Sequence, residues 1–62
     1  MKTFAKETSA MAFARRECLP INVEPAAEKN SEGLYVPVAR LRADQDWMCS
    51  SLLQRGLNVH QS

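Results

Sequence analysis

The spacing of apolar residues along the chain first predicts a helix over residues 3–18. This stretch is rich in helix-forming side chains and contains neither Gly nor Pro. The helix should end at Leu19, because the residue before a proline (here Pro20) avoids helical backbone geometry. Phe13 falls on the side of this helix opposite its main apolar stripe. The stripe expected to face the core consists of Phe4, Met11, Ala14 and Cys18.

A second pattern, over residues 34–39, predicts a short strand. Val36 and Val38 alternate around Pro37, and β-branched and aromatic residues suit a pleated surface. Because proline has no N–H, the strand should either lie at the edge of its sheet or leave that side of Pro37 unpaired. In the alternative interpretation Pro37 occupies the first turn of the following helix, where its missing N–H has no cost. That arrangement makes Val36 the N-cap, which is a poor residue for the position, so we favour the strand.

Residues 42–55 predict a second helix, ending at Gly56, a typical C-cap residue. Asp44 and Asp46 in the first turn complement the helix dipole. Trp47 lies nearly opposite the apolar stripe, and its large apolar surface predicts a second buried face. The expected core stripe consists of Leu41, Gln45, Met48, Cys49, Leu52 and Leu53.

The remaining segments lack a clear period. Residues 19–33 contain turn-forming residues and several charges, and we interpret them as a linker. Residues 56–62 are too short for a further element and predict a frayed tail. The resulting fold class is mainly α with one short strand, in α-β-α order, within a single domain of residues 1–62.

The length of the chain then bears on its assembly. A chain of 62 residues buries only about 60% of its unfolded surface, so its core is marginal. Small folds usually gain stability from disulfides, a metal or a partner chain. The two-faced helices therefore predict an intertwined homodimer. Its expected interface consists of Phe13, Tyr35, Val36, Val38, Trp47, Met48 and Leu52.

The charge distribution narrows the function classes. The net charge is +1, with both signs interspersed, which does not indicate a dedicated nucleic-acid or membrane protein. No apolar run is long enough for a signal peptide or a membrane span. We therefore expect a cytoplasmic protein with reduced thiols and without a membrane partner.

Candidate catalytic and metal-binding residues are few. Cys18, Cys49 and His60 are the soft metal ligands, and they lack the paired spacing of zinc sites. A Cys49–His60 dyad would combine a helix-face thiol with a tail imidazole, a poor arrangement for nucleophilic catalysis. With two glycines, Gly33 and Gly56, the chain has no phosphate-binding glycine loop. We expect no enzyme activity, cofactor, metal or small-molecule substrate.

Two surfaces are candidates for macromolecular contacts. Arg40 and Arg42 could contact a nucleic-acid backbone, or could serve as solubilising charge beside nearby acidic residues. Met11, Trp47 and Leu53 could form a groove for the amphipathic helix of a partner protein. The homodimer interface could instead bury these apolar residues.

One resemblance covers about a third of the chain. The run from Tyr35 to Leu57, with Arg40 in the strand and Arg55-Gly56 ending the helix, is similar to the strand and first helix of ribbon-helix-helix repressors. In that family the strand pairs with its twin and reads DNA, which would assign base contact to Arg40. The chain departs from the pattern because it lacks room for the second helix. The resemblance implies, as an alternative, a dimeric DNA-binding regulator.

A second resemblance concerns the whole chain. Phe13-Ala-Arg-Arg-Glu-Cys-Leu-Pro20 followed by Gly33-Leu-Tyr-Val-Pro-Val-Ala-Arg-Leu41 resembles the small early-region proteins of lambdoid phages, encoded between the exonuclease and excisionase genes. The resemblance implies a non-enzymatic regulatory protein that favours lytic development by binding a host or phage protein. It transfers no functional residues. A purely structural, self-associating module is a further alternative.

Overall fold

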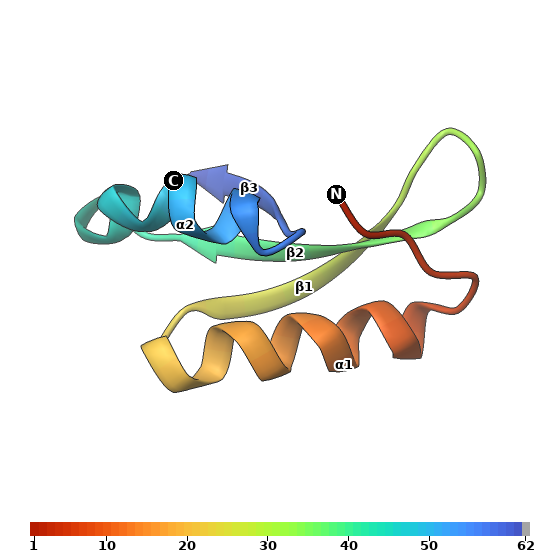
Figure 1. Cartoon of the computed structure of the whole chain (residues 1–62), viewed down its shortest axis with the longest axis horizontal. Coiled ribbons are helices and arrows are strands. Elements are labelled where there is room, and N and C mark those ends of the chain that lie inside the picture. The colour runs from red at the N-terminus through yellow and green to blue at the C-terminus, as the bar shows by residue number, and fades with distance from the viewer. Residues whose placement is uncertain (62) are drawn as a thin grey trace.

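Helical and extended segments alternate along residues 1–61, the part of the chain that the computed structural model describes (Figure 1). The fold is α+β, which corrects the expected mainly α class with a single strand. The elements are the helix α1 (Glu7–Cys18), the 3₁₀ turn η1 (Leu19–Ile21), the strands β1 (Glu24–Lys29) and β2 (Tyr35–Leu41), the 3₁₀ helix η2 (Ala43–Met48), the helix α2 (Cys49–Gln54) and the strand β3 (Asn58–Gln61).

The sheet has the strand order β1-β2-β3, with β2 in the centre. β1 and β2 form an antiparallel hairpin whose register runs from Glu24 opposite Arg40 to Lys29 opposite Tyr35. β3 pairs in parallel with the second half of β2. A parallel pair needs a crossover connection, which η2 and α2 provide between β2 and β3. Figure 1 shows α1 along β1, and α2 beside β2 and β3.

The expected linker over residues 19–33 is wrong, because most of it forms η1 and β1. The β1 sequence Glu-Pro-Ala-Ala-Glu-Lys is rich in residues that are depleted in strands. Its partner β2 and the turn between them hold it extended. In that turn the Asn30 side-chain oxygen accepts hydrogen bonds from the backbone N–H groups of Glu32 and Leu34, at 2.9 and 3.0 Å. Strand pairing therefore overrides local propensity in this segment.

The expected frayed tail is also wrong over residues 58–61, which form β3; Ser62 lies outside the described residues. The preceding Leu57 is fully buried and anchors the segment to the core. Four residues suffice because β2 supplies the backbone partners. Residues 58–61 thus form the third strand of the sheet.

Pro37 predicted either an edge strand or a strand with one side unpaired at the proline; β2 is central, so the edge position is wrong. Tyr35 exchanges two backbone hydrogen bonds with Phe4 on the side of β2 away from β1. Backbone groups alternate along a strand, so the nitrogen of Pro37 faces that same side. There it falls between the Phe4 bridge at Tyr35 and the start of β3 opposite Val38. The missing donor therefore lies in a gap between two partners.

Both predicted helices change their bounds. The first begins at Glu7, because Phe4 is extended and bridges to Tyr35. The second consists of a 3₁₀ segment followed by a short α-helix. The strand prediction is the most accurate, since β2 covers Tyr35–Leu41 and the first-turn alternative for Pro37 is excluded.

A single core joins both halves of the chain. Ala39 and Leu41 point to one side of β2, and residues from both helical segments pack there. Ala10, Ala14 and Cys18 are fully buried at every fourth position of α1, and such small side chains let the helix approach the sheet closely. The buried cluster consists of Ala14, Cys18, Val23, Ala39, Leu41, Met48, Leu52 and Leu57.

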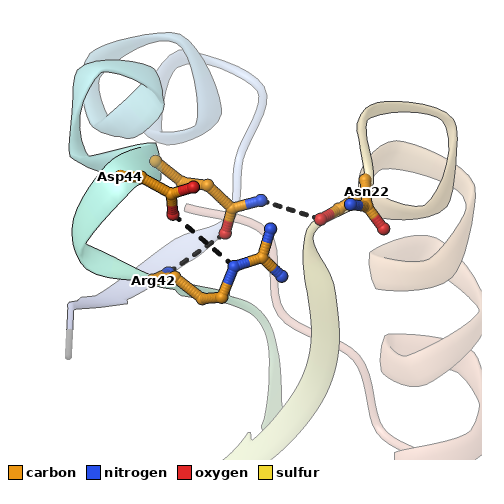
Figure 2. Close-up of polar contacts among 4 residues, drawn as sticks. Asn22, Arg42 and Asp44 are labelled. Atoms are coloured by element: carbon orange, nitrogen blue, oxygen red, sulfur yellow. Dashed lines mark hydrogen bonds and ion pairs between the residues drawn. The ribbon is translucent and has the colours of Figure 1, made fainter.

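Gln45 links the two halves by hydrogen bonds (Figure 2). Its Nε2 donates to the backbone oxygen of Asn22 at 2.8 Å, and its Oε1 accepts from the N–H of Arg42 at 3.0 Å. The second bond is the reach-back half of a capping box at the start of η2. Gln45 is only 5% exposed, and both of its hydrogen bonds are partly buried. A glutamine therefore lies in the expected core stripe because its side chain hydrogen-bonds two backbone groups.

We expect Gln45→Ala to lower the free energy of unfolding by roughly 1–2 kcal/mol, because it removes the hydrogen-bond partner of two partly buried backbone groups. Urea titration followed by circular dichroism measures the change. Gln54→Ala is the control, since Gln54 is exposed. An equal effect of the two substitutions would show that the Gln45 bonds add nothing to stability.

Gly56 and Gly33 form a matched pair for a second stability measurement. Both have positive φ, +95° and +82°, so alanine is strained at either site by roughly 1–3 kcal/mol. A Cβ on Gly56 would also lie 3.1 Å from Cγ of Lys2, whereas one on Gly33 meets nothing within 4 Å. We therefore expect Gly56→Ala to destabilise more than Gly33→Ala in urea titrations. Equal losses would mean that the Lys2 side chain yields freely.

Candidate interaction surfaces

The residues predicted for the dimer interface lie partly in the interior and partly on the surface of a single chain. Val36, Val38, Met48 and Leu52 are buried within the chain itself. Phe13 and Tyr35 are half-buried, and Trp47 is exposed. β2 has β1 along one edge, and Phe4 with β3 along the other. Both edges of β2 are therefore paired within the chain, and the expected intertwined dimer, in which this strand is buried between subunits, is wrong.

Trp47 is the most exposed large apolar side chain of residues 1–61, at 79%. The geometry of η2 explains this position. A 3₁₀ helix has three residues per turn, so Gln45 and Met48 share the inward side. Asp44, Asp46 and Trp47 are left on the outside. We call these three residues the Trp47 corner; it combines an aromatic side chain with two carboxylates.

The other residues of the predicted partner groove lie apart along the fold. Leu53 is 47% exposed on α2 and follows Trp47 in the same helical region. Met11 is half-buried on α1 and lines a shallow hollow there with Glu7, Thr8, Ala12 and Arg15. Met11 therefore belongs to a surface of the first helix, and Trp47 and Leu53 to the second helical region.

Arg40 and Arg42 are both exposed near the end of β2. Acidic groups lie beside each of them. Glu24 is the cross-strand partner of Arg40, and Nε of Arg42 lies 3.5 Å from the Asp44 carboxylate (Figure 2). These acidic neighbours offset the positive potential that would attract a phosphate backbone. Both arginines line a hollow with Glu24, Leu41, His60 and Gln61.

The imidazole of His60 contacts a carboxylate. Its Nε2 lies 2.9 Å from Oε1 of Glu28, a bond that spans β2 from β3 to β1. Cys49 packs against the core, and Cys18 is buried in it; both thiols are free. Within residues 1–61, no three His, Cys, Asp or Glu side chains gather in a way that could hold a metal ion.

Sequence reasoning missed a hollow at the start of α1. Phe4 and Phe13 lie with ring centroids 5.8 Å apart, tilted by 44°. Two cations lie over the Phe13 ring, with Lys2 Nζ 5.6 Å and Arg16 Cζ 5.2 Å from its centroid. We call this the Phe13 hollow; its volume is about 540 Å³. It is lined by Lys2, Phe4, Ser9, Ala12, Phe13 and Arg16.

The only sequence signal for this hollow was the placement of Phe13 off the main apolar stripe of its helix. Phe4 was expected within that helix, on the opposite stripe. The bridge between Phe4 and Tyr35 takes Phe4 out of the helix and brings its ring to Phe13. A local period cannot reveal such a contact, because it depends on a strand thirty residues further along. In the described part of the chain, no helix has the length and apolar character required to cross a bilayer.

The two thiols should differ in reactivity. Burial, and secondarily the charge of Glu17, raise the pKa of Cys18. A raised folded-state pKa keeps the thiol protonated, so its contribution to stability is lost as the pH rises above the pKa of the unfolded thiol.

We expect iodoacetamide to label the half-buried Cys49 before Cys18 in the native protein, measured by peptide mass mapping. Urea should equalise the rates. Equal labelling without urea would contradict the burial of Cys18.

Comparison with known proteins completes the description of these surfaces. No protein-family model, curated protein or solved structure matches the chain. The function is therefore argued from the side chains that the fold exposes.

Proposed function

We propose that the chain is a non-enzymatic accessory protein that binds another protein through the Trp47 corner. The observation that carries this proposal is the 79% exposure of Trp47 in a chain that contains one tryptophan. Tryptophan is among the residues that most often dominate binding energy at protein interfaces. Its indole offers a large apolar surface at a low cost in conformational entropy.

The surroundings of Trp47 support a protein partner. Gln45 is buried and fixed by two hydrogen bonds, so the turn that presents the indole is held from beneath. A pre-organised anchor loses less entropy when it binds. Asp44 and Asp46 beside the indole favour a partner with a basic rim and an apolar pocket. Acidic flanks of this kind disfavour nucleic acid at the same surface.

The proposed partner is a regulatory protein of a phage or its bacterial host, bound so as to favour lytic development. This part of the proposal rests on the resemblance to lambdoid early-region proteins. The ribbon-helix-helix alternative has less support, because β2 is a central strand and Arg40 lies beside Glu24. Arg42 is likewise placed against Asp44.

The test places a photoreactive residue at the exposed Ser50, within the same helical region as Trp47. Infected cells are irradiated, and the crosslinked proteins are compared between otherwise wild-type protein and Trp47→Ala. We expect a captured partner that Trp47→Ala loses. With that partner purified, Trp47→Ala should weaken binding by at least tenfold, about 1.4 kcal/mol, measured by calorimetry.

Leu19→Ala is the matched control, since Leu19 is 60% exposed and lies outside the corner. Its binding should equal that of the wild type. Both variants should keep the wild-type stability, because neither side chain is buried. Capture that survives Trp47→Ala would refute the corner as the anchor. A salt-dependent shift of DNA that Arg40→Ala abolishes would instead support the DNA-binding alternative.

A further inference from the structure

The Phe13 hollow is held together by contacts from distant parts of the chain. The backbone N–H of Lys2 donates to the oxygen of Gly56 at 3.0 Å. Phe4 exchanges two backbone hydrogen bonds with Tyr35, at 2.8 and 2.7 Å. These bonds place the first residues of the chain beside α1. The hollow is therefore a product of the folded sheet, because backbone pairing brings Lys2 and Phe4 against α1.

The lining of the hollow is aromatic and positively charged. Lys2 and Arg16 lie over the Phe13 ring, and none of the six lining residues is acidic. Glu17 lies near Arg16, with 3.5 Å between its carboxylate and Nε of that arginine. The same Glu17 carboxyl group also lies 3.6 Å from the Arg55 guanidinium, so its charge is shared between two cations. Such a lining suits a segment that carries a carboxylate next to an aromatic side chain.

The same chain exposes a segment with this chemistry. The Trp47 corner carries Asp46, and Asp44 with Arg42 3.5 Å away, beside an indole. Trp47 is too exposed to occupy the hollow of its own chain. The hollow has a volume of about 540 Å³, which falls within the range of pockets that bind small molecules. The two surfaces are complementary in charge and in aromatic character. This complementarity favours a second copy of the chain as the occupant of the hollow.

We propose that the Trp47 corner of one copy docks into the Phe13 hollow of a second copy. This inference rests on the proposed function in using Trp47 as the binding anchor, and it names a partner for that anchor. Asp46 or Asp44 of one copy lies against Lys2 and Arg16 of the other, and the indole packs on the Phe4 and Phe13 rings. If each copy inserts its Trp47 corner into the hollow of the other, the two copies form a closed dimer with a two-fold axis. If only one such contact forms per pair, further copies can add and form open filaments.

The contact predicts a dependence on salt. Its charged groups lie at the surface of each free chain, so added salt screens their attraction, with a Debye length of about 10 Å at 0.1 M. Self-association should therefore weaken at high salt. Burial of the indole in the hollow should shift the Trp47 emission to the blue as the protein concentration rises.

The experiment exchanges charges between the two surfaces. Lys2→Glu reverses a charge of the hollow, and Asp46→Lys reverses one of the corner. We expect each variant alone to self-associate about tenfold more weakly than the wild type by sedimentation at low salt. An equimolar mixture should regain association, because Glu at position 2 then faces Lys at position 46, while the native pair forms in the other contact.

Lys6→Glu and Glu32→Lys are the matched controls, since both side chains are exposed and lie outside the two surfaces. They should associate as the wild type does. A wild-type chain that stays monomeric across the concentration series would overturn the proposal, as would a mixture that fails to regain association. The proposed function fails separately, when Trp47→Ala leaves the crosslinked partner bound. Preserved capture by Lys2→Glu alongside lost self-association would assign the hollow to self-association alone.

Discussion

The pairing of β2 on both of its edges is the constraint on which the rest of the structure depends. β1 pairs along one edge, while Phe4 and β3 share the other. Because β2 also presents Ala39 and Leu41 to the core, this strand joins every part of the described chain. Segments that are weak on their own, such as β1 and β3, acquire backbone partners from it. The small chain thus gains long-range contacts that a helical arrangement would lack.

The pairing of β2 also determines which side chains meet at the surface. The Phe4 bridge brings Lys2 and Phe4 against α1, where Phe13 and Arg16 complete a basic aromatic hollow. The crossover from β2 to β3 begins with a 3₁₀ helix that directs Trp47 outward. A molecule with a net charge of only +1 therefore has local regions of opposite sign. The proposed interactions depend on this local separation of charge, which the overall charge does not report.

Sequence periods predicted the elements whose apolar residues lie at local spacing. The strand at residues 34–39 was placed within two residues of β2. The inward stripe predicted for the second helix correctly contained Met48 and Leu52, but it also contained Leu53, which is 47% exposed. β1 and β3 were missed because their residues do not favour strands, and pairing with β2 holds them extended. Trp47 lies opposite the inward stripe, as the period predicted, but it is 79% exposed in the chain, where a second buried face was expected. The Phe13 hollow could not be predicted, because the Phe4 bridge forms only in the folded sheet.

By itself the sequence determined where a core could form and which residues were available for chemistry. Apolar spacing depends on neighbouring residues, so it is readable without a fold. Tertiary structure alone decided the sheet order, the position of the Pro37 nitrogen between two partners of β2, and the grouping of Lys2, Phe4 and Phe13. These features join residues that are far apart in the chain, through backbone hydrogen bonds that no local pattern records. The positions of Trp47 and of the Phe13 hollow follow from that arrangement.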